Sequence, residues 1–309
     1  MFRIIGETNL DFIGARKFAF VLSAALIALG LFALFMVVTG RANLGIDFAG
    51  GTMIYGTFEN EVAIDDLRTA ISTDFPDATI TELSDFDKPN AFIVKVKRPE
   101  SEAEGRERSE RLKEVIVAAF EGNRFTVESE HVIGPAVGKS LSKDAQKAVM
   151  LSLCCIVIYI WIRFDFRSGI AATIATFHDV LAVLGITYLI GLEFDLLLIT
   201  ALLTLGGYSL TDTVVVFDRI RENLKKFRSK GEFASSVNAS INEVLSRTVN
   251  TSLTTLLVVG TLFFLGGEVL RTFALAMILG VLVGTYSSVF VASPIVVEWE
   301  ARSPKRFKR

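Results

Sequence analysis

The sequence predicts a helical membrane protein that has six transmembrane helices and one external α+β domain of the ferredoxin-like type. Three observations lead to this fold class. Hydrophobic residues make up 51% of the 309 positions and the mean hydropathy is +0.49, values typical of integral membrane proteins. Six segments approach the roughly 20 apolar residues that a bilayer core of about 30 Å requires. A long polar stretch, residues 39–147, separates the first segment from the other five.

The apolar segments predict the six helices in chain order. The first follows Arg16 and Lys17 and is longer than the roughly 7 to 15 apolar residues of a secretory signal, which predicts an uncleaved anchor. The second and fifth are short, so flanking residues must enter the membrane or the bilayer must thin around them. The predicted spans are Phe18–Val38, Ala148–Ile162, Ile170–Gly191, Leu196–Phe217, Thr248–Leu265 and Leu270–Val297.

Lysine and arginine in the short loops predict the orientation, because cytoplasmic loops of membrane proteins are enriched in them. They precede the first span, link the second to the third, follow the fourth and close the chain, whereas the other short turns carry only Arg271. Both termini are therefore predicted to be cytoplasmic and residues 39–147 external. The predicted parts are residues 1–38, 39–147, 148–297 and a basic tail, 298–309. The residues that place loops inside are Arg3, Arg16, Lys17, Arg163, Arg167, Arg219, Arg221, Lys225, Lys226, Arg228, Lys230 and those of the tail.

The external segment has a secondary-structure pattern of its own. Two charged segments place apolar residues at helical spacing, and four others have the composition or the alternation of strands. Their order, βαββαβ, predicts a ferredoxin-like unit. His131 has no companion residues at metal-ligand spacing, so we interpret the domain as a binding element or a lever. The strands are expected within 52–59, 78–83, 91–99 and 125–134, and the helices within 61–75 and 101–122.

Nothing in the chain predicts an enzyme, a metal site or a cofactor. Cys154 and Cys155 are adjacent within the second span and cannot form an ordinary structural disulfide. Residues Gly134–Ser140, GPAVGKS, imitate a phosphate-binding loop, but the two glycines lie one residue too close for the pattern G-x-x-x-x-G-K-[ST]. The predicted orientation also places this loop on the side without ATP.

The strongest functional indication is Asp212, a carboxylate inside the fourth span. A charged side chain at mid-membrane depth costs about 2.5 to 3.5 kcal/mol, so it normally faces other helices and has a partner. Ser209 and Gly206 precede Asp212 at intervals of three, and Thr213 follows it. This spacing indicates a small and polar face that packs against neighbouring helices.

The fifth span offers Asp212 a partner. Arg247, Thr251, Thr254 and Thr255 stand at positions i, i+4, i+7 and i+8, which is one helix face of hydrogen-bond donors headed by a cation. We therefore expect Arg247 to pair with Asp212 inside the membrane. Such a pair is either a functional site, the default for ionisable groups in membranes, or a purely structural ion pair.

Other polar and small residues in the spans point to a tightly packed bundle. His178 and Asp179 belong either to the same functional site or to ordinary hydrogen bonds between helices. Asp218 lies at the membrane exit among arginines, which favours an interface role. Small residues predict close helix packing at Ala171, Ala175, Ala182 and Gly185 in the third span, and at Gly280, Gly284, Ser287 and Ser288 in the sixth. The faces that carry Gly206, Ser209, Gly280 and Gly284 are expected to receive the helices of a partner protein.

Five motifs carry a resemblance to a known family. In this order, and with six spans and one small external domain, the chain resembles the SecF-type members of the SecD/SecF family of bacterial protein-export membrane proteins. The resemblance implies half of a bundle of the resistance-nodulation-division superfamily, with the other half supplied by SecD. The motifs are NLGIDFAGGT (43–52), VIGPAVGKSL (132–141), FDFR (164–167), GYSLTDTVVVFDRIREN (207–223) and RTVNTSLTTL (247–256).

The resemblance also implies roles for individual residues. Asp212 and Arg247 would take part in proton conduction, with Ser209 and Thr251 beside them, and an acid of SecD would complete the path. His178 and Asp179 are further candidates for this path. The motif residues around the external domain are implied to be structural: Asp47, Gly50, Gly51, Gly134, Pro135 and Gly138.

The implied function is that of an accessory subunit of the Sec translocase in the bacterial cytoplasmic membrane. Together with SecD it would use the proton-motive force to move an unfolded preprotein after SecYEG and SecA have begun translocation. Neither a cofactor nor nucleic acid is implied. Two other functions remain open: a proton-coupled half of a small-molecule or lipid exporter in the same superfamily, and a translocon scaffold without proton coupling.

Overall fold

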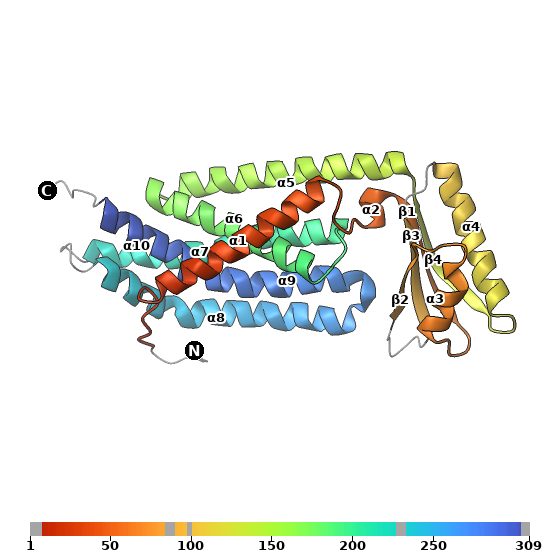
Figure 1. Ribbon diagram of the computed structural model, residues 1–309. Coiled ribbons are helices and arrows are strands. Elements are labelled where there is room, and N and C mark those ends of the chain that lie inside the picture. The colour runs from red at the N-terminus through yellow and green to blue at the C-terminus, as the bar shows by residue number, and fades with distance from the viewer. Residues whose placement is uncertain (1–7, 84–89, 98–100, 227–232, 304–309) are drawn as a thin grey trace.

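The computed structural model describes residues 8–83, 90–97, 101–226 and 233–303. A long helix bundle carries a small sheet domain at one end (Figure 1). Among the described residues, six helices are long and apolar enough to cross a membrane, as predicted. Arg3, Arg228, Lys230 and the last six residues of the basic tail, 304–309, lie outside the described residues.

Five of the membrane helices are continuous and the sixth changes its winding. The sixth consists of α9 (Gly267–Ser287), a π-helical turn η2 (Ser288–Ala292) and α10 (Ser293–Arg302). Pro294 has no backbone N–H with which to continue the α-helical ladder. Beside it, the Ser293 hydroxyl donates to the carbonyl of Ser288 at 3.0 Å. The continuous helices are α1 (Arg16–Val38), α5 (Pro135–Arg163), α6 (Phe166–Leu189), α7 (Leu196–Lys226) and α8 (Phe233–Leu265).

The two spans that were expected to be short belong to long helices. α5 begins at Pro135 rather than near Ala148, and α8 begins at Phe233 rather than near Thr248. Hydrophobicity marks only the part of a helix that contacts lipid, whereas both helices continue through polar residues beyond that part. The predicted boundary between the external and membrane parts, at residue 147, falls inside α5.

The external domain has the predicted order of elements. Its strands form a sheet in the order β2-β3-β1-β4 with antiparallel neighbours, which is the ferredoxin-like arrangement. α3 and α4 cover one face of this sheet (Figure 1) and enclose a core that includes Phe58, Leu67, Phe92 and Leu112. The elements are β1 (Gly51–Phe58), α3 (Ile64–Ser72), β2 (Thr79–Leu83), β3 (Ala91–Lys97), α4 (Glu102–Ala119) and β4 (Phe125–Ile133), preceded by an unpredicted short helix, α2 (Ile46–Ala49).

The bundle packs through small residues, as its sequence predicts, but within this one chain. A Cβ atom added to Gly280 would lie 2.6 Å from Leu205, and one added to Gly284 would lie 3.0 Å from Ser209, so α9 packs closely on α7. A Cβ on Gly206 would lie 3.3 Å from Ile156 of α5. The expectation that these faces receive a partner protein is therefore wrong, because neighbouring helices of the same chain already cover them.

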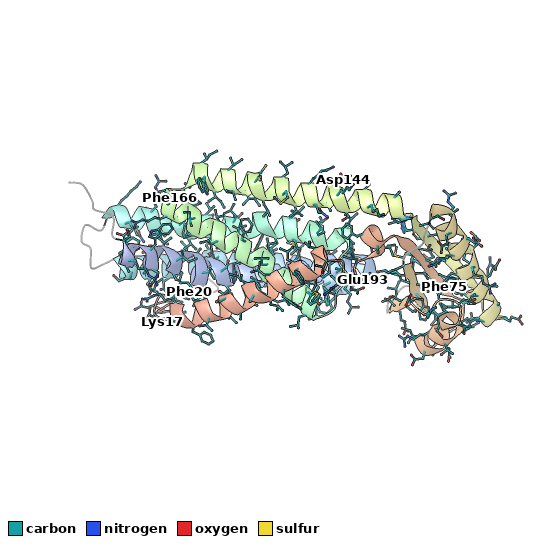
Figure 2. The ribbon with its side chains drawn as sticks, turned by 45° about the horizontal axis from the view of Figure 1, so that its top comes forward. Lys17, Phe20, Phe75, Asp144, Phe166 and Glu193 are labelled. Atoms are coloured by element: carbon teal, nitrogen blue, oxygen red, sulfur yellow. The ribbon has the colours of Figure 1, made fainter. Side chains whose placement is uncertain are left out.

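Both ends of the helical part lie on the side of the bundle opposite the sheet domain (Figure 1). Figure 2 shows Lys17 and Phe166 at that side and Glu193 at the side that meets the domain. α1 begins and α10 ends on the same side, as six crossings require. That this side is cytoplasmic stays a prediction from the loop charges.

Candidate functional site

Asp212 lies in the second half of α7, just before the core residues Val216, Phe217 and Ile220. Its side chain is buried, and its Oδ2 atom has no hydrogen-bond partner among the described residues. An ionised carboxylate in such surroundings is costly unless a proton or a partner compensates its charge. The charge of Asp212 therefore depends on whether a proton or a cation reaches its carboxylate.

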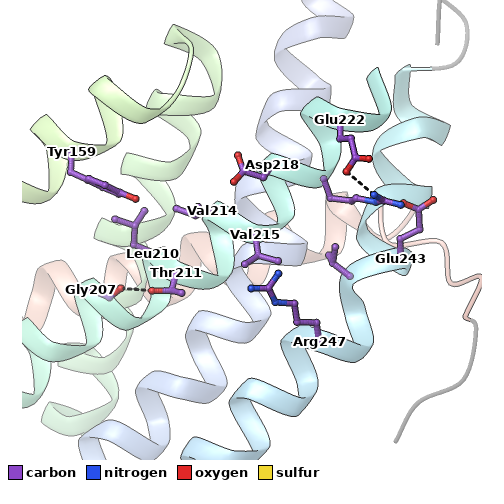
Figure 3. Close-up of a pocket in the computed structure, with 12 residues that line it drawn as sticks. Tyr159, Gly207, Leu210, Thr211, Val214, Val215, Asp218, Glu222, Glu243 and Arg247 are labelled. Atoms are coloured by element: carbon purple, nitrogen blue, oxygen red, sulfur yellow. Dashed lines mark hydrogen bonds and ion pairs between the residues drawn. The ribbon is translucent and has the colours of Figure 1, made fainter. Parts of the chain in front are cut away.

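Arg247 does not form the expected ion pair with Asp212. It lies on an exposed face of α8, near enough to Asp212 for their charges to interact, but no nitrogen–oxygen contact within 4.0 Å joins them in the described part of the chain. Figure 3 shows the guanidinium directed toward α7, close to Val215. The physical reason is that Asp212 is buried, whereas Arg247 is exposed in the wall of the groove between α7 and α8. Side-chain direction of this kind cannot be read from spacing within a single helix.

A groove of about 770 Å³ lies beside Arg247, between α5, α7 and α8. The α7 wall presents Gly207 and Thr211, the α8 wall presents Arg247, and Tyr159 comes from α5 (Figure 3). Both polar and apolar side chains line it, which suits a contact with another polypeptide better than a contact with lipid alone. The remaining lining residues are Leu210, Val214, Val215, Asp218, Arg219, Glu222, Glu243 and Val244.

Ser209 contacts Asp179 instead of Asp212. Asp179 Oδ2 accepts hydrogen bonds from the hydroxyls of Ser209 on α7 and Ser287 on α9, the latter at 2.7 Å. Its Oδ1 atom lies 2.8 Å from Nδ1 of His178. All four side chains are buried. The structure thus brings His178, Asp179 and Ser209 together in a polar centre between α6, α7 and α9, which we call the Asp179 centre.

Thr251 also has a more local role than expected. Its hydroxyl donates to the carbonyl of Arg247 at 2.6 Å, one turn earlier in α8. A threonine has a single donor, so this bond leaves none for Asp212. Asp218, by contrast, behaves as predicted for a residue at the membrane interface: it forms a partly exposed ion pair with Arg163, the last residue of α5.

The external domain and the bundle meet at a joint formed by the segment after α1 and the turn between α6 and α7. Asp47 Oδ2 accepts a hydrogen bond of 3.0 Å from the backbone N–H of Leu196, the first residue of α7. The backbones of Asn43 and Phe194 are bonded at 2.8 Å, and Gly45 donates to the carbonyl of Phe194 at 2.9 Å. Asp47 therefore anchors the base of the domain to the start of the helix that carries Asp212.

Three charged side chains reinforce this joint. Lys95 and Lys97 of β3 each lie 2.8 Å from a carboxylate oxygen of Glu193, and Lys97 also donates to Asn43 Oδ1 at 2.8 Å. Burial alone would raise the pKa of Glu193, but hydrogen bonds and charge from the two lysines outweigh it and hold the pKa below its usual value. Glu193 is therefore ionised at neutral pH and ties β3 to the membrane helices.

The predicted structural motif residues surround the same joint. Gly50 has φ +74°, a left-handed conformation that favours glycine, and a Cβ on Gly138 would approach the carbonyl oxygen of Phe48 to 3.1 Å. α5 begins at Gly134 and Pro135, which are favourable residues before and at the first helical position. Gly51 begins β1, where a Cβ would lie 2.5 Å from the carbonyl oxygen of Val96. These residues let α2, β1, β3 and α5 approach one another closely.

Sequence reasoning missed the joint residues Glu193, Lys95 and Lys97. The turn GLEFD was used only for its lack of lysine and arginine, yet a signal was present in it. Two acids in a turn next to a membrane face need compensating cations, and the strand KVK presents two lysines on one face of its sheet.

Comparison of the sequence with known proteins identifies a family and close relatives. Residues 113–302 match the family described as "Protein export membrane protein SecD/SecF, C-terminal". "Protein translocase subunit SecF" of Thermodesulfovibrio yellowstonii is 50% identical to the chain, covering 96% of it and 97% of the relative. The same-named subunit of Vibrio alginolyticus is 41% identical, covering 96% of the chain and 92% of the relative.

Solved structures of related proteins have the same fold. The crystal structure of SecDF from Thermus thermophilus, a translocon-associated membrane protein, superposes with a TM-score of 0.78 at 41% identity and covers 96% of this chain. A crystal structure of SecDF in a super-membrane-facing form gives a TM-score of 0.67 at 40% identity and covers 98%. The chain spans 39% and 40% of those two longer proteins.

Proposed function

Because the chain belongs to the SecD/SecF family of protein-export membrane proteins, we propose that it couples inward proton flow to the late movement of a preprotein. It is a multi-pass membrane subunit of the Sec protein translocase and associates with SecD. In this proposal the membrane is the bacterial cytoplasmic membrane, and both termini are cytoplasmic. SecYEG and SecA begin the translocation of an unfolded preprotein that this subunit then continues.

The observation that carries the proposal is the buried Oδ2 atom of Asp212, which lacks a hydrogen-bond partner in the described chain while Arg247 faces a groove nearby. A purely structural carboxylate inside a membrane would be expected to have its bonds satisfied. Asp179 shows what such satisfaction looks like in the same bundle. Asp212 is better suited to gain and lose a proton.

SecD is the proposed occupant of the groove. Thr200, Thr204, Gly207 and Thr211 are exposed on α7 at intervals of four, three and four residues, which makes one small-residue face. Such a face gives lipid little contact but lets another helix approach closely. The SecD helix would bring the acid that the family places in the path, opposite the exposed Arg247.

Protonation of Asp212 would change the forces across this interface. Ionised Asp212 attracts Arg247, whereas protonated Asp212 does not, and Arg247 then turns toward the acid of SecD. Each proton that passes would therefore shift α7 relative to α8 and to the helices of SecD.

The joint would convey this shift to the external domain. α7 starts at the hydrogen bond between Leu196 and Asp47 and carries Asp212 further along the same continuous helix. Glu193, directly before α7, holds β3 through two lysines. A tilt of α7 would thus move the sheet domain, which would pull or ratchet the emerging preprotein.

The other two functions are less well supported. The relatives are named as protein translocase subunits, which favours preprotein over a small molecule or lipid as the transported species. A scaffold without proton coupling gives no account of the unpartnered Asp212.

The test is preprotein movement in membrane vesicles that contain SecYEG, SecA, SecD and a variant of this chain. Asp212→Asn combined with Arg247→Met leaves neither an acid nor an unpaired cation. We expect the double variant to assemble with SecD and keep ATP-driven initiation but lose export that depends on the proton gradient. Asp144→Asn, a change of an exposed acid of α5 that does not line the groove, is the control and should keep it. Full gradient-dependent export by the double variant would show that Asp212 does not carry the protons.

A further inference from the structure

The Asp179 centre has an unusual charge balance. Asp179 has an exposed fraction of 0% and His178 one of 1%. His178 is the only basic residue that contacts the carboxylate in the described structure. The other charged residues of the surrounding helices lie elsewhere: Arg16 and Lys17 at the start of α1, Arg167 at the start of α6, Asp212 and then residues from Asp218 onward in α7, and residues of the first two turns of α9.

Charge neutrality requires that the pair hold one proton more than a neutral imidazole and an ionised carboxylate hold together. A neutral imidazole beside an ionised carboxylate carries a net charge of −1, and an isolated charge in a medium of low dielectric costs several kcal/mol even after relaxation. Imidazolium with carboxylate, or imidazole with carboxylic acid, has no net charge. The 2.8 Å separation of His178 Nδ1 and Asp179 Oδ1 suits either arrangement.

The pair is also closed to exchange. The side chains that line the groove beside Arg247 include neither His178, Asp179 nor Ser209. Both carboxylate oxygens of Asp179 are engaged by His178, Ser209 and Ser287, whereas Asp212 Oδ2 has no partner in the described chain, so Asp179 presents no free oxygen to an incoming proton. A proton placed here therefore stays here while protons pass Asp212.

We propose that His178 and Asp179 hold one permanent proton, and that this neutral pair clamps α7 to α9 through Ser209 and Ser287. The clamp positions Asp212, because Ser209 lies one helical turn before it in α7. On the other side, Ser287 directly precedes the π-helical turn η2. The proposal removes His178, Asp179 and Ser209 from the set of residues that carry protons.

Other groups around the clamp fit a positioning role. Tyr286 of α9 has its ring centre 6.2 Å from that of His178, and its hydroxyl lies 3.1 Å from Ser23 Oγ and donates to the carbonyl of Ala19 at 2.9 Å. α1 is thereby bonded to the same part of α9. Tyr286 of α9 is the titratable side chain whose ring contacts His178 in the described structure, and it is not a cation.

Nuclear magnetic resonance can test whether the pair exchanges its proton as the pH changes, because the chain has only two histidines. His131→Gln removes the one in the external domain, so a ¹⁵N-histidine label carried by this chain alone, reconstituted with unlabelled SecD in lipid nanodiscs, reports on His178 alone. We expect its imidazole resonances to stay constant from about pH 5 to pH 8, a range that brackets the ordinary histidine pKa of about 6.5. The chemical shifts of the His178 imidazole should differ between Asp179→Asn and the protein that keeps Asp179. An imidazole that titrates within this range would overturn the proposal.

Export separates the clamp from a proton carrier. Asp179→Asn keeps the size and polarity of a permanently neutral centre, so it should assemble and retain gradient-dependent export. Asp179→Leu removes every acceptor and should lower the unfolding temperature. Normal assembly with lost gradient-dependent export in Asp179→Asn would make Asp179 a carrier instead. The export measurement rests on the proposed function, whereas the measurement of the His178 resonances does not. If Asp212→Asn exports normally, the proposed function fails, and the His178 resonances still decide this inference.

Discussion

Gly185 determines how closely α1 can approach α6. A Cβ atom at this position would lie 2.8 Å from the backbone nitrogen of Gly30, and one on Gly30 would lie 2.2 Å from the carbonyl oxygen of Leu181. Two backbones in contact gain dispersion energy along their whole crossing, which is the main attraction between helices in lipid. The predicted small-residue face of α6 is thus confirmed as a packing face.

Gly185→Leu should therefore separate α1 from α6. Overpacking of this kind costs about 1 to 3 kcal/mol, and backbone atoms cannot move aside as a flexible side chain can. We expect a lower midpoint of thermal unfolding in detergent. The control is Gly260→Ala on α8, where no atom lies within 4 Å of an added Cβ, so the midpoint should not fall. Equal midpoints for the two variants would contradict the close crossing.

Single residues also show how far sequence reasoning reaches into the site. Asp212, Arg247, His178 and Asp179 could all be identified, because an ionisable group stands out against apolar neighbours. Their partners could not, since partnership depends on the rotation of each helix about its axis. Ser209 lies one turn from Asp212 in sequence but turns toward α6, where Asp179 accepts its hydrogen bond.

At the scale of elements, the joint makes the start of α7 part of the external domain's support. Hydrogen bonds to charged groups contribute about 1.5 to 3 kcal/mol each; Glu193 accepts one from Lys95 and forms a second ion pair with Lys97. The low pKa of Glu193 fixes the sign of the pH effect. Its contribution is fully present above the ordinary glutamate pKa of about 4.3 and is lost as pH falls through the lower pKa of the folded state.

Glu193→Gln should loosen the joint at neutral pH. We expect backbone amides of β3 and residues 191–196 to exchange deuterium about tenfold faster or more, because the lost bonds exceed the 1.36 kcal/mol that corresponds to a factor of ten. Gradient-dependent export should fall as well. Asp144→Asn is a matched control: its pair with Lys147 at 2.9 Å lies on an exposed part of α5, where such pairs contribute little. Unchanged exchange in Glu193→Gln would show that the backbone bonds alone hold the joint.

Most elements of the fold could be predicted from periodicity, and the exceptions share a cause. Alternation in β2 and β3 and apolar spacing in α3 and α4 predicted the ferredoxin-like order correctly. α2 has only four residues, too few for a helical pattern to repeat. The polar ends of α5 and α8 were missed because hydropathy detects contact with lipid and not helical conformation.

The sheet domain and the opposite end of the bundle are predicted to lie on opposite sides of the membrane, and cysteine labelling can test this. After Cys154 and Cys155, both exposed and unpaired, are replaced by serine, a cysteine at position 90 should react with an impermeant reagent from outside the cell. A cysteine at position 226 should react only once the cytoplasmic side is opened. This outcome follows from the loop charges, which place the two positions on opposite sides. External labelling at position 226 would refute the six-span orientation.

α5 fixes the rotation of the external domain relative to the helix bundle. It is a single α-helix of 29 residues, about 44 Å long at 1.5 Å per residue, and it runs without interruption from the sheet domain into the membrane. Each residue of an α-helix advances the azimuth by about 100°. One residue more or fewer would therefore turn the sheet through more than a right angle and carry Lys95 and Lys97 away from Glu193. The number of residues in α5 thus determines how the external domain is rotated about the axis of this helix. The joint can form only at the rotation that this helix length gives.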